Sequence, residues 1–356
     1  APNRVLAAAC AYAKYASATP TDVHSIVTKV ADYYLAHRTA EESADCGWKQ
    51  AAFMQGVMAT ARTTGDARWL DVAQQWAEQH DWRTCKYPNV LSERSAANDM
   101  SCGQTFAELY LERKQDDHYL ESIRDDVLAK LVARPQVDDW WWVDAYFMAL
   151  GTFARIGHIT GNVAYHDKGF ALYNDSATRR GLWSAEDGLY WRDETYKNQT
   201  TPSGARVFWG RGNGWAAGAL ARTLMFTPRT HPAHAVYAAQ LAAMAPAARR
   251  TQGDDGFWRA SILDAQQVPN PEITSTAGLT FGLAYGVNAG LLDRTTFLPV
   301  VRKAWAGLAQ VAVQPSGLLG YCQPVGGGPA PANASQTSDF CVGLFLLAAS
   351  QVAKLT

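Results

Sequence analysis

The sequence predicts an all-α protein, an (α/α)6 barrel of about six helical hairpins, and three observations point to this fold. Apolar residues recur at helical spacing along most of the chain, whereas strand-like alternation is confined to short pieces near 189–193 and 206–209. The helices fall into consecutive pairs, and short helices rich in Ala and Gly can pack closely as an inner and an outer ring. Because no Pro- or Ser-rich linker divides the chain, we expect residues 1–356 to form a single domain.

Capping and turn residues support the individual helices. Thr21 and Asp22, Thr274 and Ser275, and the stretch 335–339 supply start signals, and turn residues such as those at 64–66 and 160–162 separate neighbours. The expected helices are 4–17, 22–37, 48–64, 67–80, 98–115, 118–132, 140–160, 163–173, 212–226, 234–249, 274–291, 297–312 and 336–352.

Three segments ahead of or inside helices form a weak internal repeat, which we call the echo. In each, a glycine is followed by an apolar residue and then by an aromatic or polar residue. They are GLYWRD (188–193), GFWRA (256–260) and GLLGYCQ (317–323). An α-solenoid of helical pairs is the alternative architecture, although the irregular loops and the lack of a clean repeat period argue against it. In a barrel, the loops at one end would form a funnel that gathers many of the Trp, Tyr and Arg residues.

Composition limits the possible partners. Hydrophobic residues make up 48% of the chain and charged residues only 18%, which is typical of a globular protein with a large core. The formal net charge of -1 provides no field to attract nucleic acid or an anionic membrane. No run approaches the roughly 18 apolar residues of a membrane span. We therefore expect neither a nucleic acid nor a membrane as partner, and the oligomeric state stays open.

The cysteines and the glycosylation-type triplets favour a secreted or periplasmic protein. Six cysteines occur without a CxxC motif, and Cys322 and Cys341 flank a Gly/Pro/Ala loop, so they are the pair most readily bridged. Glycosylation-type triplets begin at Asn174, Asn198 and Asn333. The first residues lack a basic leader and a long apolar segment, as a processed secreted chain would.

Asp144 is the leading catalytic candidate. It follows three consecutive tryptophans, and the expected helix around it is otherwise built from Ala, Tyr, Phe, Met, Leu and Gly. Desolvation in such surroundings raises the pKa of a carboxyl group, which suits a general acid near neutral pH. A buried aspartate that caps or pairs with another helix is the alternative.

Asp99 is the second acidic candidate. It opens an apparent helix, where Asn98 or Asp99 would serve as the N-cap. If this helix start faces the funnel, Asp99 lies opposite Asp144, and two carboxylates across a sugar are the usual equipment for glycoside chemistry.

The stretch VFWGRGNGWAAGAL (207–220) predicts a saccharide pocket. Arg211 lies between glycines, and a guanidinium can bind a carboxylate through two hydrogen bonds, so an acidic sugar is a natural partner. Packing in the core or exposure in a turn are the alternatives for these residues. The stretch is no phosphate loop, no GxSxG or HExxH occurs, and the eight histidines are dispersed, so we expect neither a metal nor a cofactor. Flat rings for sugar stacking come from Trp140, Trp141, Trp142, Trp183, Trp191, Trp209, Trp215 and Trp258.

Several motifs together resemble glycoside hydrolase family 105, the unsaturated rhamnogalacturonyl hydrolases and related unsaturated glucuronyl hydrolases. The motifs are WGRGNGW (209–215), WVDAYFMAL (142–150), ANDMSCGQTFAELY (97–110), DGFWRASILD (255–264) and PEITSTAGLTFGLAYGVNAGLL (271–292). The resemblance extends over nearly the whole chain. It implies an (α/α)6 barrel and removal of a terminal Δ4,5-unsaturated uronic acid from lyase-generated oligosaccharides by hydration of its vinyl ether.

The resemblance also implies roles for particular residues. Asp144 would protonate C4 and then, as a carboxylate, activate water for attack at C5, while Asp99 would bind and position the sugar. The other substrate-binding candidates are Trp209, Arg211, Trp215, Arg192, Trp141 and Asn213.

One departure leaves the substrate open. Many family members have Tyr-His where this chain has Trp191 and Arg192, and Arg192 would replace the histidine as a ligand for the uronate carboxylate. The terminal sugar can therefore be a glucuronyl or a galacturonyl unit. An inverting glycosidase with Asp99, Asp139 or Glu272 as base, a lyase on the same barrel, and a non-catalytic saccharide-binding protein are the alternatives.

Overall fold

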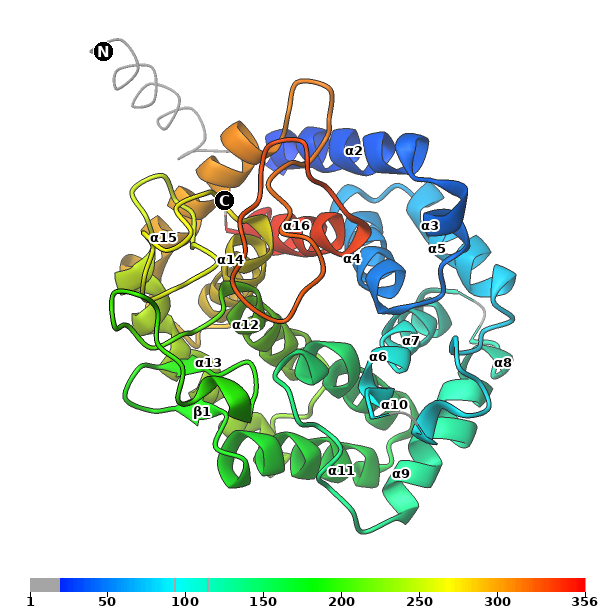
Figure 1. Ribbon diagram of the computed structural model, residues 1–356. Helices are drawn as coiled ribbons and strands as arrows, with labels where there is room; N and C mark the ends of the chain where they lie inside the picture. Colours follow the sequence, from blue (N-terminus) through cyan, green and yellow to red (C-terminus); the bar gives the residue numbers. More distant parts are fainter. Residues whose placement is uncertain (1–19, 93, 114, 356) are drawn as a thin grey trace, which may run out of the picture.

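A computed structural model describes residues 20–92, 94–113 and 115–355, and it shows two concentric rings of helices (Figure 1). The all-α fold and the (α/α)6 barrel expected from the sequence are confirmed. The helix expected at 4–17 lies outside the described residues.

The inner ring closes on itself. Each of its helices packs against the next around the ring, and the last one packs against the first. Its members are α4 (Trp48–Thr64), α7 (Cys102–Glu112), α10 (Gly151–Thr160), α12 (Gly210–Leu224), α14 (Ile273–Asn288) and α16 (Asp339–Val352).

The outer ring surrounds these helices and alternates with them along the chain. It consists of α2 (Pro20–His37), α5 (Arg68–Gln79), the run α8 (His118–Glu121), η2 (Ser122–Leu128) and α9 (Ala129–Ala133), then α11 (Val163–Asn174) with η4 (Asp175–Arg179), α13 (Pro232–Thr251), and α15 (Arg294–Gly307) with η6 (Leu308–Ala312). Short elements lie in the connections: α3 (Ala40–Ala44), η1 (Val90–Ser92), α6 (Ala96–Asp99), η3 (Tyr146–Leu150), η5 (Glu194–Tyr196), and the antiparallel pair β1 (Trp183–Ser184) and β2 (Leu189–Tyr190).

Two expected helices differ from the structure in ways that matter for function. The helix expected at 140–160 begins only at Asp144, because the residues before it are extended and Trp142 forms a β-bridge with Asp193. The helix expected at 98–115 is split into α6 and α7 by a turn at 100–101. Of the two strand-like pieces, the first contains β2, and the second is a loop that ends in a β-bridge between Trp209 and Ser261.

Inner helices approach each other where both lack a side chain. A Cβ atom on Gly278 of α14 would lie 2.6 Å from the backbone of Gly214 on α12. A Cβ atom on Gly343 of α16 would lie 2.2 Å from the backbone oxygen of Ala52 on α4. These glycines therefore let the backbones pack more closely than any larger residue would allow.

The three echoed segments all lie in connections that lead from an outer helix to the next inner one. Their first glycines have left-handed backbones, with φ of 70° at Gly188, 88° at Gly256 and 104° at Gly317. This conformation favours glycine, which explains why the same residue recurs. The repeated glycine thus reflects the same outer-to-inner connection, which recurs in successive helical hairpins of the barrel.

Two disulfides tie loops to the barrel. The expected pair Cys322–Cys341 is present, and a second disulfide joins Cys46 and Cys85. Cys102 is a buried free thiol, and Cys10 lies outside the described residues. Asn174, Asn198 and Asn333 are exposed. Within the described ranges, no helix is long and apolar enough to cross a membrane.

Candidate active site

Asp144 is the first residue of the helical turn that leads into η3 and α10. The residue as a whole is half-buried, yet its Oδ2 is enclosed and has no hydrogen-bond partner among the described residues. A buried oxygen without a partner is costly unless it bonds a ligand or carries a proton. This atom is therefore suited to receive a proton or a water that the protein does not supply.

Hydrogen bonds join the backbone before Asp144 to two neighbouring segments. The backbone N–H of Val143 donates to the carbonyl of Arg192 at 2.9 Å. The Asn213 side chain accepts from the backbone N–H of Tyr190 at 2.8 Å and donates to the carbonyls of Tyr190 and Trp209, each at 3.0 Å. Asn213 thus joins the first turn of α12 to the segment that carries Arg192, and its polar atoms are occupied by the backbone.

Charged groups of both signs surround Asp144. Burial raises the pKa of Asp144 to about 6, against the opposing effect of Arg192 and Arg211, while Asp193 raises it further. A carboxyl group with this pKa is divided between its protonated and ionised forms near neutral pH. It can therefore donate a proton and afterwards accept one.

Arg211 is almost fully buried in the first turn of α12, with 1% of its surface exposed. Its Nε donates to Thr274 Oγ1 at 3.1 Å, and its Nη2 donates to the carbonyls of Gln323 and Pro324. Its Nη1 forms no hydrogen bond with any residue that the structure describes. The guanidinium is thus fixed in position and keeps one donor nitrogen for a ligand.

Arg192 and Trp141 lie together beside Asp144. The guanidinium carbon of Arg192 lies 5.0 Å from the centre of the Trp141 ring, and that of Arg94 lies 4.5 Å from it. Arg192 pairs with Asp193 through Nη1, and its buried Nε has no partner in the described part of the chain. A cavity of about 270 Å³ adjoins this group and is lined by Trp141, Arg94 and Arg180 among others.

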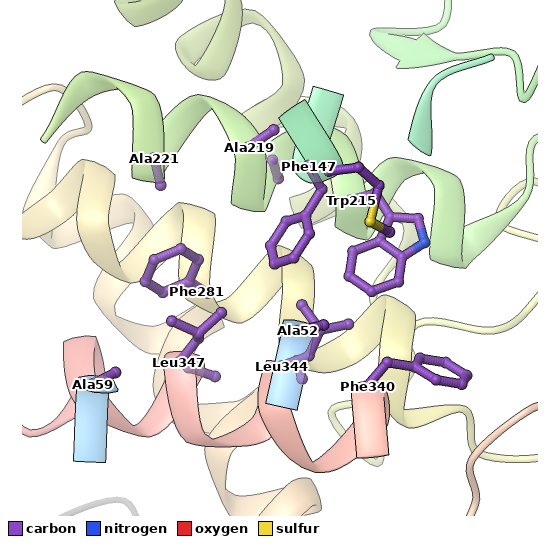
Figure 2. Close-up of a cluster of buried hydrophobic side chains, with 14 of the residues drawn as sticks. Ala52, Ala59, Phe147, Trp215, Ala219, Ala221, Phe281, Phe340, Leu344 and Leu347 are labelled. Carbon is purple, nitrogen blue, oxygen red and sulfur yellow. The ribbon is translucent and has the colours of Figure 1, made fainter. Parts of the chain in front are cut away.

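Trp209 and Trp215 contribute to the site from within the core. Each exposes 1% of its surface, so neither presents an open face at the mouth. Trp209 donates through Nε1 to Gln323 Oε1 at 3.1 Å, and Trp215 packs against Phe147 with ring centres 4.5 Å apart. Figure 2 shows Trp215 beside Phe147 in the buried cluster formed by the inner helices. These rings therefore support the polar groups around Asp144.

The capping role expected for Asp99 is wrong. Asp99 is the last residue of α6, and the residue before α7 is Ser101, so the chain turns once more before the long helix begins. Asp99 is half-buried on an element that packs against η3, the helix that follows Asp144. It therefore remains a candidate for holding substrate on the same side of the barrel.

Of the other carboxylates considered as a catalytic base, Glu272 is occupied by protein partners. It is the N-cap of α14, and its oxygens accept from the N–H and hydroxyl groups of Thr274 and Ser275. Asp139 forms an ion pair with Arg134 through Oδ1, while its enclosed Oδ2 has no hydrogen-bond partner among the described residues. Glu272 is therefore not arranged as a second acid or base beside Asp144.

Two supporting residues were missed from the sequence. Gln323 contacts both Trp209 and Arg211, although more than a hundred residues separate it from them, and Asp193 pairs with Arg192. Only the GLLGYCQ echo marked the region of Gln323. Of the side chains the structure describes, the single cluster with metal-ligand spacing is Asp45 with Cys46 and Cys85, whose sulfurs form a disulfide.

The segment before α16 crosses the mouth of the barrel. In Figure 1 this orange-red stretch passes in front of α14 and α16 toward the middle of the ring. The hydroxyl of Tyr196 donates to the carbonyl of Gly327 at 2.8 Å, and Gln323 contacts the first turn of α12. The segment is therefore bonded both to the loop that carries Tyr196 and to the start of α12.

A helical barrel with a carboxyl group of raised pKa near the buried Arg211 and the half-buried Arg192 is suited to a carbohydrate-active hydrolase. The family model of Glycosyl Hydrolase Family 88 matches residues 23–356, and the chain belongs to this family. It is 30% identical over 329 residues to a protein from Formosa agariphila named unsaturated 3S-rhamnoglycuronyl hydrolase, and the match covers 86% of this chain and 84% of the relative.

Solved structures agree with this assignment. A glycosyl hydrolase family 88 protein from Bacteroides vulgatus has a TM-score of 0.89 and 28% identity, and the match covers 95% of this chain and all of that one (100%). A possible member of the GH105 family from Salmonella enterica shares the fold, with a TM-score of 0.78, 17% identity and coverage of 95% of both chains. The expected relationship is thus confirmed, and family 88 is the family whose model matches.

Proposed function

We propose that the chain removes a terminal Δ4,5-unsaturated uronic acid, glucuronyl or galacturonyl, from oligosaccharides released by a polysaccharide lyase. The observation that carries this proposal is the enclosed carboxyl group of Asp144, which has a raised pKa and lies under the influence of Arg192 and Arg211. The name of the Formosa relative makes a rhamnose-linked unsaturated uronyl oligosaccharide the first substrate to test.

The reaction needs a single acid and base. Asp144 donates its proton to C4 of the double bond, and the resulting carboxylate takes a proton from water as the water oxygen bonds to C5. The hemiketal formed at C5 then opens and releases the next sugar. One water is consumed, and Asp144 ends protonated as it began. An inverting glycosidase needs a second carboxylate as base, and the engagement of both Glu272 oxygens by Thr274 and Ser275 argues against Glu272 in that role.

Recognition of the uronate carboxylate is assigned to the two arginines. Arg211 offers Nη1 and Arg192 offers its unpaired Nε. The first turns of α12, α14 and α16 also converge on this end of the barrel, and helix N-termini favour negative charge. Trp141 and Asp99 would contact the remainder of the sugar, whereas Trp209, Trp215 and Asn213 would hold the pocket in shape.

The test follows the ultraviolet absorbance of the C4=C5 bond during incubation with lyase-generated oligosaccharides. Asp144→Asn keeps the shape of the side chain but removes its acid function, so we expect turnover to fall by about 10²- to 10⁴-fold. Asp71→Asn removes an exposed carboxylate of α5 that pairs with Arg113, and it should leave turnover unchanged. Stable absorbance with wild-type protein on both glucuronyl and galacturonyl substrates would contradict the proposal, as would full activity of Asp144→Asn.

A further inference from the structure

A second cavity lies at the opposite end of the barrel from Asp144. Its volume is about 450 Å³, and its lining comes largely from the C-terminal halves of the inner helices α4, α7, α12 and α16. Arg211 lies in the first turn of α12 and Met225, which lines this cavity, directly follows its last residue. Fifteen helical residues span about 22 Å, so this basal cavity is separate from the candidate active site.

A buried cluster of arginines around one glutamate borders the basal cavity. Glu108 accepts hydrogen bonds from Arg62, Arg155 and Arg222, each at 2.8 Å or less. Only 1% of the Glu108 and Arg155 side chains and 3% of Arg222 is exposed. Burial alone would raise the pKa of Glu108, but the three guanidinium groups hold it well below its ordinary value. One carboxylate thus faces two buried cations, Arg155 and Arg222, and the exposed Arg62.

The cavity lining as a whole has more positive than negative charge. Lys354 joins the three arginines, while Glu112 joins Glu108, so two of the four cations lack a matching carboxylate. The converging C-termini of the inner helices balance part of this excess, because the carbonyl end of a helix has partial negative charge. Burial, and then Arg155, lower the pKa of Arg222 to about 9. That shift is expected of a guanidinium with too little negative charge around it.

Arg222 also keeps an unused donor. Its Nε donates to Gln104 Oε1 and its Nη2 to Glu108, both at 2.8 Å. Its Nη1 forms no hydrogen bond within the described ranges and is not among the enclosed polar atoms, so it is open to the cavity that Arg222 lines. Apolar side chains that include Met225, Phe226, Phe281 and Leu347 form part of the wall, beside the polar residues His24, Thr63, Ser350 and Gln351.

We propose that the basal cavity binds a small organic anion, with the anionic group on Arg222 and Lys354 and an apolar body against Met225 and Phe281. A free inorganic anion would use only the cations, and a neutral apolar molecule would leave them unpaired. This inference does not depend on the reaction at Asp144.

The test measures binding by calorimetry with three probes at constant ionic strength. Benzoate has a carboxylate on an apolar ring, benzamide has the same ring without charge, and sulfate has charge without the ring. We expect benzoate to bind wild-type protein at least about tenfold more tightly than either other probe. Equal binding of benzoate and sulfate, equal binding of benzoate and benzamide, or no binding of benzoate would overturn the proposal.

Variants at the cavity rim locate the binding without disturbing the core. Met225 is 38% exposed, so Met225→Glu adds a negative charge that the fold can tolerate, and it should weaken benzoate about tenfold or more. The matched Met225→Gln variant should keep most of the affinity. Lys354→Ala should also weaken benzoate, whereas Arg192→Ala, at the other end of the barrel, should not. Loss of binding in Arg192→Ala with retention in Met225→Glu would place the anion at the active site instead and refute the basal site.

Discussion

Asp144 is enclosed by charges of both signs, and these charges set the pH at which it can give up a proton. Burial favours the neutral carboxyl group, and Asp193 acts in the same direction, while Arg192 and Arg211 favour the carboxylate. The balance leaves the pKa at about 6. As a proton donor, Asp144 is competent below this pKa and loses its proton as the pH rises through it.

Arg192→Ala should therefore shift the pH profile in a defined direction. Loss of the cation disfavours the carboxylate and also leaves Asp193 unneutralised, so the pKa of Asp144 rises and the alkaline fall of kcat/KM moves to higher pH. Arg192→Lys keeps the charge and should leave the profile close to that of wild type. KM should increase in both variants if Arg192 binds the uronate. An unchanged profile in Arg192→Ala would show that Arg192 does not control this acid.

The raised pKa of Asp144 was predictable from its neighbours, because an aspartate among aromatic and aliphatic residues is expected to be desolvated. The positions of Arg192 and Arg211 in the fold could not be predicted from the sequence. The sequence shows Arg211 between glycines, but its burial depends on the carbonyls of Gln323 and Pro324, more than a hundred residues away. Similarly, the saccharide-facing role expected for Trp209 and Trp215 overlooked how deeply the inner ring buries them.

At the scale of single elements, the contact between α12 and α14 depends on particular glycines. Gly214→Ala would place a Cβ atom 2.7 Å from the carbonyl oxygen of Thr274, a backbone atom that cannot move without shifting α14. We expect a loss of about 1–3 kcal/mol in the free energy of unfolding, measured by denaturant titration. Arg211 lies in the same turn, so activity should fall as well.

Gly218→Ala is the matched control, one turn later on the same helix. Its Cβ would lie 3.3 Å from the Phe147 ring, which can tilt, and 3.7 Å from the Phe281 ring, an ordinary contact distance. The higher helix propensity of alanine offsets the remaining strain, so the stability should change little. If both variants were equally destabilised, the close approach of α12 and α14 would not be the cause.

The helices themselves followed from periodicity, and α4 occupies the range expected for it. Periodicity failed where an apolar run is not helical: Trp140 and Trp142 are buried on an extended segment, and consecutive apolar residues give no sign of that difference. The break between α6 and α7 was missed for a related reason. The turn consists of Met100 and Ser101, and neither is a Gly or Pro that would indicate a turn in the sequence.

At the scale of the whole molecule, the disulfide Cys322–Cys341 connects stability to the active site. It closes a separation of 19 residues, and it adjoins the carbonyls that hold Arg211. Replacing both cysteines with serine should reduce the free energy of unfolding by about 3 kcal/mol. Because Gln323 and Pro324 lose their anchor, KM should also rise several-fold.

The disulfide Cys46–Cys85 offers the comparison, with a separation of 39 residues. Its double serine variant should lose about 4 kcal/mol, yet its KM should stay near the wild-type value, since neither cysteine adjoins a residue that binds Arg211. Thermal unfolding and steady-state kinetics, measured on the wild-type protein and on the two double-serine variants, separate the effect on stability from the effect on KM. An equal rise in KM for both pairs would mean that stability alone governs the site.

The segment that crosses the mouth, bonded to Tyr196 on one side and to α12 on the other, limits how a polymer can approach. The proposed substrate reacts at its terminal sugar, so only that terminus has to reach Asp144. Under the proposed function, the rate of degradation is then set by the number of chain ends in solution and not by the mass of polysaccharide. Each internal cut made beforehand by a lyase creates one unsaturated end, whereas the original ends of the polymer have no C4=C5 bond, so the number of sugars that this enzyme can release is limited by the number of cuts.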